Sequence, residues 1–149
     1  MDYGWTAENV ALRQEVRNFI TENITPDVLD ELRLSGEANR GPSEQVRYIS
    51  PLAAEVHKKI AEKGWIGISW PKEYGGRGAN LIEWLIFEEE YYRAGAPGRV
   101  NQNGIFLLGP TLMDYGSEEQ RSRYLPKMAS GEEVWAQGWS EPNAGSDMA

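Results

Sequence analysis

Apolar residues recur at helical spacing in one segment after another, and this pattern constrains the fold more than any other feature of the sequence. Three of the segments begin with a residue suited to cap a helix, namely Thr6, Asn80 and Ser117. Asn80 and Ser117 are each followed three residues later by Glu or Gln, which completes a capping box. We therefore predict an all-α helical bundle, with helices over residues 6–22, 27–34, 51–64, 80–94, 105–116 and 117–128.

The last part of the chain follows a different pattern. Gly131 breaks the helical run, and residues 134–140 are aromatic and β-prone, which favours an extended strand. The sequence therefore predicts two parts: a helical domain over residues 1–133 and the start of a truncated β-domain over residues 134–149.

Composition and charge exclude several classes of protein. The chain has 149 residues, which suits a single domain, and its formal net charge of -8 without a basic stripe argues against a nucleic-acid partner. No apolar run approaches the ~20 residues needed to span a bilayer, so membrane insertion is not expected. The absence of cysteine excludes disulfides and thiolate metal sites. The N-terminus has no secretory pattern, and we expect a cytoplasmic location.

Three features could suggest chemistry, but each favours a structural interpretation. Gly75, Gly76 and Gly78 lack the Lys-Ser/Thr pair of a phosphate loop, so they predict a sharp turn between helices. His57 has no second ligand at metal-binding spacing, and we expect a partly exposed surface histidine. The carboxylates of residues 88–90 diverge around a helix, which favours ion pairs between helices or solvation. No metal site is predicted.

The most apolar segment of the chain covers residues 105–113. Pro110 lies within it and should either kink the helix or mark its first turn. Such a helix either lines a pocket or forms the centre of the core, and the sequence favours the core. Residues 99–108 remain a candidate for part of an apolar pocket.

The terminal segment carries the densest group of candidate ligand-binding residues. A tight turn at residues 142–143 is flanked by the hydroxyls of Ser140 and Ser146, and Gly145 allows a ligand to approach the main chain. Trp139 offers a flat apolar face. These residues suit a flat heteroaromatic cofactor with a phosphate tail, but the residues by themselves favour a structural strand and turn.

The same motif, QGWSEPNAGSD at residues 137–147, resembles the signature of the acyl-CoA dehydrogenase family. Residues 64–78, GWIGISWPKEYGGRG, resemble a second pattern of that family, and residues 109–132 resemble a third. The resemblance covers about residues 5–149 in the family's order.

This resemblance implies an oxidoreductase of fatty acid metabolism and β-oxidation that uses FAD to introduce an α,β double bond into an acyl-CoA thioester. A carboxylate base removes the α-proton, hydride leaves to the flavin, and electrons pass to an electron-transferring flavoprotein. The resemblance also implies that Ser146 lies near both the FAD pyrophosphate and the substrate. The implied cofactor-binding residues are Gln137, Gly138, Trp139, Ser140 and Ser146.

The family's catalytic glutamate and its remaining domains have no counterpart in these residues, so no catalytic residue is assigned, and Glu141 is not taken as the base. We expect an N-terminal portion that is inactive alone, within an enzyme that forms a homo-oligomer. Two alternatives remain open: a relative resembling acyl-CoA oxidases, and a non-catalytic helical interaction module.

Overall fold

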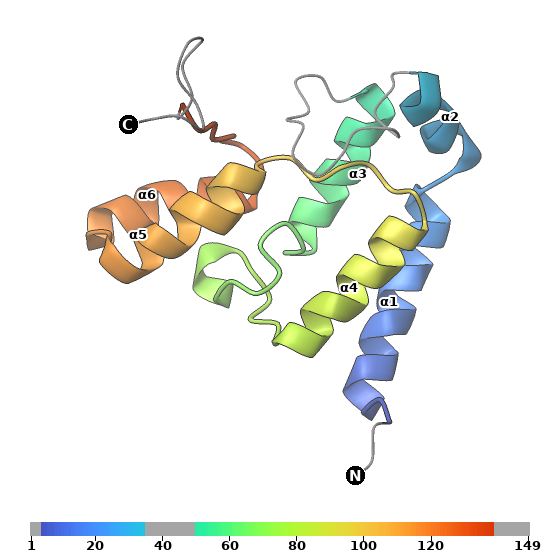
Figure 1. Cartoon of the computed structure of the whole chain (residues 1–149), viewed down its shortest axis with the longest axis horizontal. Coiled ribbons are helices and arrows are strands. Elements are labelled where there is room, and N and C mark those ends of the chain that lie inside the picture. Colours follow the sequence, from blue (N-terminus) through green and yellow to red (C-terminus); the bar gives the residue numbers. More distant parts are fainter. Residues whose placement is uncertain (1–3, 35–49, 139–149) are drawn as a thin grey trace, which may run out of the picture.

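The computed structural model describes residues 4–34 and 50–138, and within these ranges it contains helices and no strand (Figure 1). The all-α prediction is therefore confirmed. α1 lies beside α4, α5 pairs with α6, and α3 lies between the two pairs in the view of Figure 1. The elements are α1 (Ala7–Asn23), α2 (Pro26–Leu34), α3 (Pro51–Glu62), the 3-10 helix η2 (Lys72–Tyr74), α4 (Leu81–Arg93), the π-helix η3 (Gly104–Leu108), α5 (Gly109–Tyr115) and α6 (Glu118–Ala129).

The helix starts follow the capping side chains that the sequence indicates. The Thr6 side chain caps α1. The Asn80 side chain and Glu83 form a complete capping box at α4, and Ser117 and Gln120 form another at α6. These contacts lie within four residues of sequence, so local composition is sufficient to specify where each helix begins.

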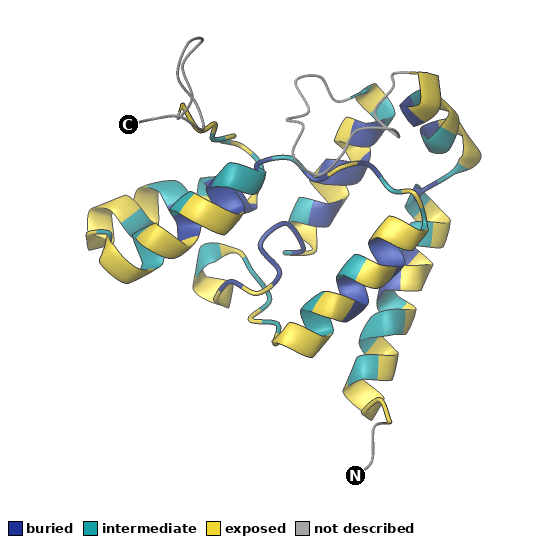
Figure 2. Ribbon diagram, in the orientation of Figure 1, coloured by how far each residue is buried: buried dark blue, intermediate teal, exposed yellow. Residues whose placement is uncertain are grey.

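The core is built around Trp65, which directly follows the turn after α3 and is fully buried. Its ring meets Phe19 of α1 edge-on at 5.1 Å between centroids, and Phe87 of α4 at 5.3 Å. Phe87 in turn stacks on Tyr91. Figure 2 shows the buried residues on the facing sides of these helices. Aromatic side chains from three segments therefore join the α1–α4 pair to the chain that leaves α3.

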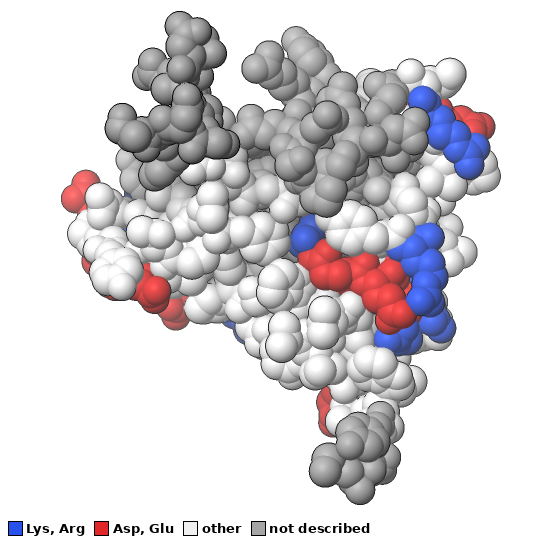
Figure 3. All heavy atoms as spheres, in the orientation of Figure 1, with Lys and Arg blue, Asp and Glu red and all other residues white. Residues whose placement is uncertain are grey.

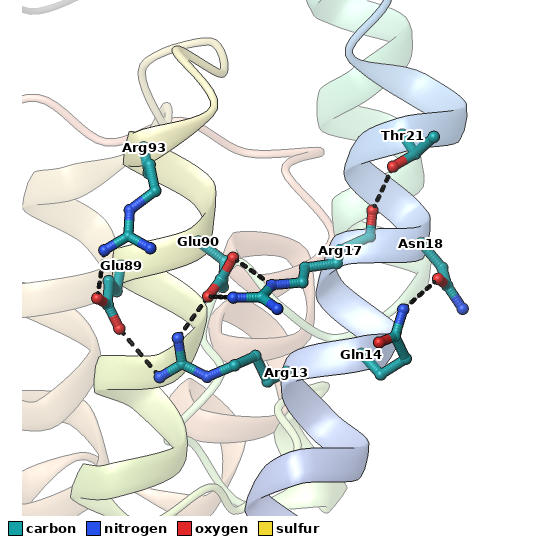
Figure 4. A network of polar contacts seen from close by, with 8 residues as sticks. All are labelled: Arg13, Gln14, Arg17, Asn18, Thr21, Glu89, Glu90 and Arg93. Carbon is teal, nitrogen blue, oxygen red and sulfur yellow. Dashed lines mark hydrogen bonds and ion pairs between the residues drawn. The ribbon is translucent and has the colours of Figure 1, made fainter.

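α1 and α4 are also joined by ion pairs (Figure 4). Glu90 is buried, and its carboxylate accepts hydrogen bonds from Arg13 at 2.5 Å and from Arg17 at 2.8 and 2.9 Å. Glu89 accepts from Arg13 and from Arg93. The two guanidinium groups hold the pKa of the Glu90 carboxyl below its ordinary value, with Arg17 the larger cause. Of the two roles expected for this acidic stretch, ion pairs between helices and solvation, Glu90 therefore takes the first.

Residues 64–78 form a turn, as predicted. The chain passes through η2 and then reverses at Gly75, whose φ of 89° places it in the left-handed region that glycine favours. Arg77 then donates two hydrogen bonds to the Glu15 carboxylate of α1, at 2.9 and 3.0 Å. The glycines therefore serve chain reversal in this structure.

The apolar segment around Pro110 forms two consecutive helices of different type. η3 is a π-helix, in which the Gly109 N–H donates to the Gly104 carbonyl five residues earlier. Pro110 then lies in the first turn of α5, where its missing N–H costs least. Ile105 is buried, whereas Phe106 and Leu107 are exposed. The preference for a purely core helix is therefore wrong, because only part of this segment faces the core.

His57 differs from the sequence prediction of a partly exposed side chain. It is 6% exposed, and its Nε2 donates to the Gly98 carbonyl at 2.9 Å. Burial lowers the pKa of His57 to about 4. The prediction is wrong because the connector after α4, residues 94–103, covers this face of α3. The helical spacing of apolar residues cannot predict a contact with a segment so distant in the sequence.

The expected strand is also not formed in the described part of residues 134–140. Residues 134–138 adopt no regular structure. β-prone composition needs a neighbouring strand to pair with, and the described residues provide none. The predicted boundary at residue 133 therefore stays a prediction.

Charge and apolar surface are separated on the face in Figure 3. Acidic and basic side chains gather over α4 and α1, whereas the neighbouring surface carries few charges. Exposed apolar side chains include Leu81 and Leu85 of α4 and Leu107 of η3. Within residues 4–34 and 50–138, no helix is long and apolar enough to cross a membrane.

Candidate functional site

An apolar cleft of about 350 Å³ opens between α4, η3, α5 and the turn before η2. Asp114 is the one charged residue in its lining, so the cleft suits an apolar ligand. Of the candidate pocket segment 99–108, Ile105 and Phe106 reach the cleft. The lining residues are Ser69, Trp70, Pro71, Trp84, Ile105, Phe106, Pro110, Met113 and Asp114.

Trp70 is a buried residue in the lining of the cleft. Its side chain is only 4% exposed, and its backbone N–H donates to the Gly67 carbonyl at 2.8 Å. The indole ring packs so closely against the start of α5 that a Cβ on Gly109 would collide with it. Glycine at this position therefore lets a large aromatic ring approach the junction of η3 and α5.

Trp84 and Phe106 form an aromatic wall of the cleft. Their rings stack with centroids 5.8 Å apart and planes 20° from parallel. Behind the wall, the Glu88 carboxylate accepts hydrogen bonds from the Trp84 indole N–H, at 2.5 Å, and from Arg99. The Arg99 guanidinium also lies 5.5 Å from the centroid of the Phe106 ring. The two members of this ion pair thus each contact one aromatic residue of the wall: Glu88 contacts Trp84, and Arg99 contacts Phe106.

Asn101 holds the start of the terminal segment against the helical body. Its φ of 64° is left-handed, and its side chain is buried. The Asn101 Nδ2 donates to the carbonyls of Met128 and Glu133, while its Oδ1 accepts from the Trp135 N–H at 2.8 Å. One side chain therefore joins the connector after α4, the end of α6 and the residues that lead into the terminal motif.

The structure describes two of the five residues predicted to bind a cofactor. Gln137 and Gly138 are exposed and adjacent, and a Cβ built on Gly138 would have no atom within 4 Å. Among the described residues, nothing packs against this backbone, and the cofactor contact of these two residues stays a prediction. Trp139, Ser140 and Ser146 lie outside the described residues.

Sequence reasoning missed the side chains that organise the cleft and the terminal segment. Trp84 and Glu88 are four residues apart on one helix, a spacing that brings side chains together and could have revealed their pairing. Asparagine tolerates left-handed backbone, which marks Asn101 as a candidate turn residue. No signal in the sequence links Asn101 to Trp135.

The described residues carry no evident reactive centre of their own. Among them, no group of three or more His, Asp or Glu side chains is placed to hold a metal ion. The arrangement is that of an apolar cleft beside an anchored terminal segment.

Comparison with known proteins identifies the class of this helical domain. The family profile described as the N-terminal domain of acyl-CoA dehydrogenases matches residues 6–132. This match covers most of the chain, and the chain therefore belongs to the acyl-CoA dehydrogenase family. The resemblance seen in the sequence motifs is confirmed.

Individual relatives agree with this assignment. The chain is 41% identical over 137 residues to the acyl-CoA dehydrogenase IpdE1 of Mycolicibacterium smegmatis, covering 92% of this chain and 33% of that protein. In the ChsE4-ChsE5 complex from Mycobacterium tuberculosis, one chain aligns with a TM-score of 0.72 and 33% identity, over 99% of this chain and 34% of its own length.

A third comparison concerns a solved structure that contains FAD. An acyl-CoA dehydrogenase from Bacillus anthracis, solved in complex with FAD, aligns with a TM-score of 0.63 and 26% identity, over 96% of this chain and 22% of its own length. The chain thus spans about a third or less of the length of these three proteins.

Proposed function

We propose that the chain is the N-terminal helical part of a flavoprotein oxidoreductase that uses FAD to introduce an α,β double bond into an acyl-CoA thioester. The observation that carries this proposal is the apolar cleft, because it lies within a domain of the acyl-CoA dehydrogenase family and suits an acyl group. Bound FAD supplies the acceptor for the hydride that leaves the β-carbon.

The terminal segment is proposed to contact the flavin. Gln137 and Gly138 offer exposed backbone groups to the ring, and the Asn101 hydrogen bond to Trp135 fixes where this segment begins. By their motif positions, Trp139 and Ser140 extend the same contact. Ser146 is proposed to lie near the FAD pyrophosphate and the thioester end of the substrate. No residue of this chain is assigned as the base.

The cleft is proposed to hold part of the acyl group. Phe106 is 38% exposed and lines the cleft, so shortening its side chain enlarges the space available to a ligand. In the full-length protein, we expect Phe106→Ala to favour longer acyl chains. The ratio of kcat/KM for a longer acyl-CoA ester to that for a shorter one should change roughly tenfold. An unchanged preference would place the acyl group elsewhere.

The reaction itself is tested with the full-length protein, acyl-CoA and an artificial dye acceptor. Dye reduction together with enoyl-CoA formation supports the proposal. Acyl-CoA-dependent hydrogen peroxide formation in air would instead favour the relative resembling acyl-CoA oxidases. A protein that binds no flavin but forms a stable, specific complex would be a helical interaction module.

The 149 residues alone are proposed neither to retain FAD nor to dehydrogenate acyl-CoA. They provide one described backbone stretch for the flavin and no assigned base. A flavin absorbance band in the purified chain, together with turnover of a dye acceptor, would contradict this expectation.

The full-length protein is proposed to act as a homo-oligomer that transfers electrons to an electron-transferring flavoprotein. The ChsE4-ChsE5 structure is a complex of two named components, which makes a two-component assembly the alternative. Mass measurement of the purified protein in solution distinguishes one kind of subunit from two. Reduction of an added electron-transferring flavoprotein tests the acceptor.

A further inference from the structure

The aromatic wall of the cleft is attached to an ion pair that does not itself line the cleft. Glu88 and Arg99 have side chains that are 19% and 7% exposed. Glu88 lies one helical turn after Trp84 in α4 and accepts the Trp84 indole N–H. Arg99 comes from the connector after α4 and contacts the ring of Phe106. Each aromatic residue of the wall therefore has one member of the pair behind it.

This arrangement restricts how Trp84 can lie. The indole N–H is the only hydrogen-bond donor of that side chain, and Glu88 is its acceptor among the described residues. Because the acceptor is held by Arg99, rotation of the indole would break a charge-assisted hydrogen bond. The stacked Phe106 ring would then lose its partner. The orientation of both cleft-facing rings thus depends on the position of one carboxylate.

A role in stability alone does not explain the pair well. Buried ion pairs are often replaceable by apolar side chains with little loss of stability, and some serve to select one conformation. Here the conformation selected is that of the two rings facing the cleft. The neighbouring Glu89 provides a contrast, because it pairs with Arg13 and Arg93, and neither of these residues lines the cleft.

We propose that Glu88 is a positioning residue that holds the Trp84–Phe106 wall rigid and thereby sets which shape of acyl group the cleft accepts. This inference rests on the proposed function for its substrate, but the placement of Trp84 can be measured without turnover. A rigid wall binds acyl groups of one width better than those of another. A mobile wall can adapt to narrow and wide acyl groups and therefore discriminates less between them.

The selectivity test compares two acyl-CoA esters with the same number of carbon atoms, nonanoyl-CoA and cyclohexylpropanoyl-CoA, on the full-length flavoprotein. We expect Glu88→Ala to bring the ratio of their kcat/KM values roughly tenfold closer to one, mainly through KM. Glu88→Gln retains an acceptor for the indole and should keep most of the selectivity. Glu89→Ala removes a neighbouring carboxylate and should leave the ratio unchanged.

A double-mutant cycle tests whether Glu88 acts through Trp84. Trp84→Phe keeps an aromatic ring in the wall but removes the N–H group. If the proposal is right, adding Glu88→Ala to Trp84→Phe changes the ratio no further. Equal effects of Glu88→Ala in both backgrounds would overturn it, as would a wild-type ratio already near one. If Glu88→Ala does not fold, Glu88→Met, which also removes the acceptor for the indole, replaces it in the same cycle.

The spectroscopic test separates this inference from the proposed function. Fluorotryptophan labelling gives one fluorine NMR signal per tryptophan, and the Trp84 signal is identified by its loss in Trp84→Phe. We expect Glu88→Ala to shift and broaden that signal, and Glu89→Ala to leave it in place. An unmoved Trp84 signal in Glu88→Ala overturns the inference even if the enzyme is active. A moved signal without any turnover supports the positioning role and contradicts the proposed function alone.

Discussion

Asn101 shows how one residue can organise two distant segments. Its side chain makes three hydrogen bonds to backbone groups, two of them to the end of α6 and its following turn, and one to the Trp135 N–H. Its left-handed backbone would be strained for most other residues. Local sequence identifies asparagine as tolerant of that backbone, but the partners lie about 30 residues away in the chain and could not be predicted.

We expect Asn101→Ala to lower the free energy of unfolding by about 2–3 kcal/mol, because it leaves buried backbone groups without partners. Chemical denaturation measures this loss. Asn103→Ala is the matched control, since no described hydrogen bond involves the Asn103 side chain, and its effect should stay within about 0.5 kcal/mol. Equal losses in the two variants would show that the Asn101 contacts contribute little.

His57 makes stability depend on pH. Its pKa is about 4 in the folded protein and near 6.5 in the unfolded chain, so the unfolded chain takes up a proton first as pH falls. The stabilisation is therefore complete above pH 6.5 and is lost as pH falls towards 4. We expect a loss of about 2 kcal/mol between about pH 7 and pH 5.

Denaturation curves at the two pH values test this, with His57→Gln as the comparison. The variant retains a donor for the Gly98 carbonyl but does not titrate, so most of the pH dependence should disappear. The Glu90 carboxyl contributes little between these pH values, because its pKa is near 4.5 in the unfolded chain and lower still in the folded protein. A wild-type protein equally stable at both pH values would contradict the assigned burial of His57.

At the scale of elements, α1 and α4 form a unit held by buried aromatic contacts and by the ion pairs at Glu90. Their starting points could be predicted from Thr6 and Asn80, because caps are local. The sequence predicts that Glu90 can form an ion pair between helices, but it does not identify Arg13 and Arg17 as the partners, because they are more than 70 residues away. From the sequence, Pro110 predicts only a kink or a helix start and does not indicate the π-helix η3 that precedes it.

We expect Glu90→Ala to destabilise the protein by about 2 kcal/mol, because it leaves Arg13 and Arg17 beside an empty buried site. The half-exposed position of Arg17 keeps the loss below that of a fully buried pair. Glu89→Ala, which removes more exposed pairs, should cost less than about 1 kcal/mol. A larger loss for Glu89→Ala would mean that the buried carboxylate is not the main connection between the helices.

At the scale of the whole molecule, the helices bring an apolar cleft and an anchored terminal segment into one domain. Sequence motifs were sufficient to identify the family, and helix periodicity was sufficient for the fold class. The cleft could not be predicted, because its lining comes from three separate stretches of the chain and depends on the close approach of Trp70 to Gly109. The proposed activity joins these features: the cleft holds the acyl group, and the terminal segment meets the flavin.

Anaerobic addition of acyl-CoA to the purified full-length protein tests this account most directly. We expect the protein to retain FAD, and its flavin absorbance to bleach as one equivalent of enoyl-CoA forms per flavin. This result follows if the substrate is oxidised by direct transfer of hydride to the cofactor. A protein that retains no flavin, or whose flavin stays oxidised with every acyl-CoA ester tried, would contradict the proposed function.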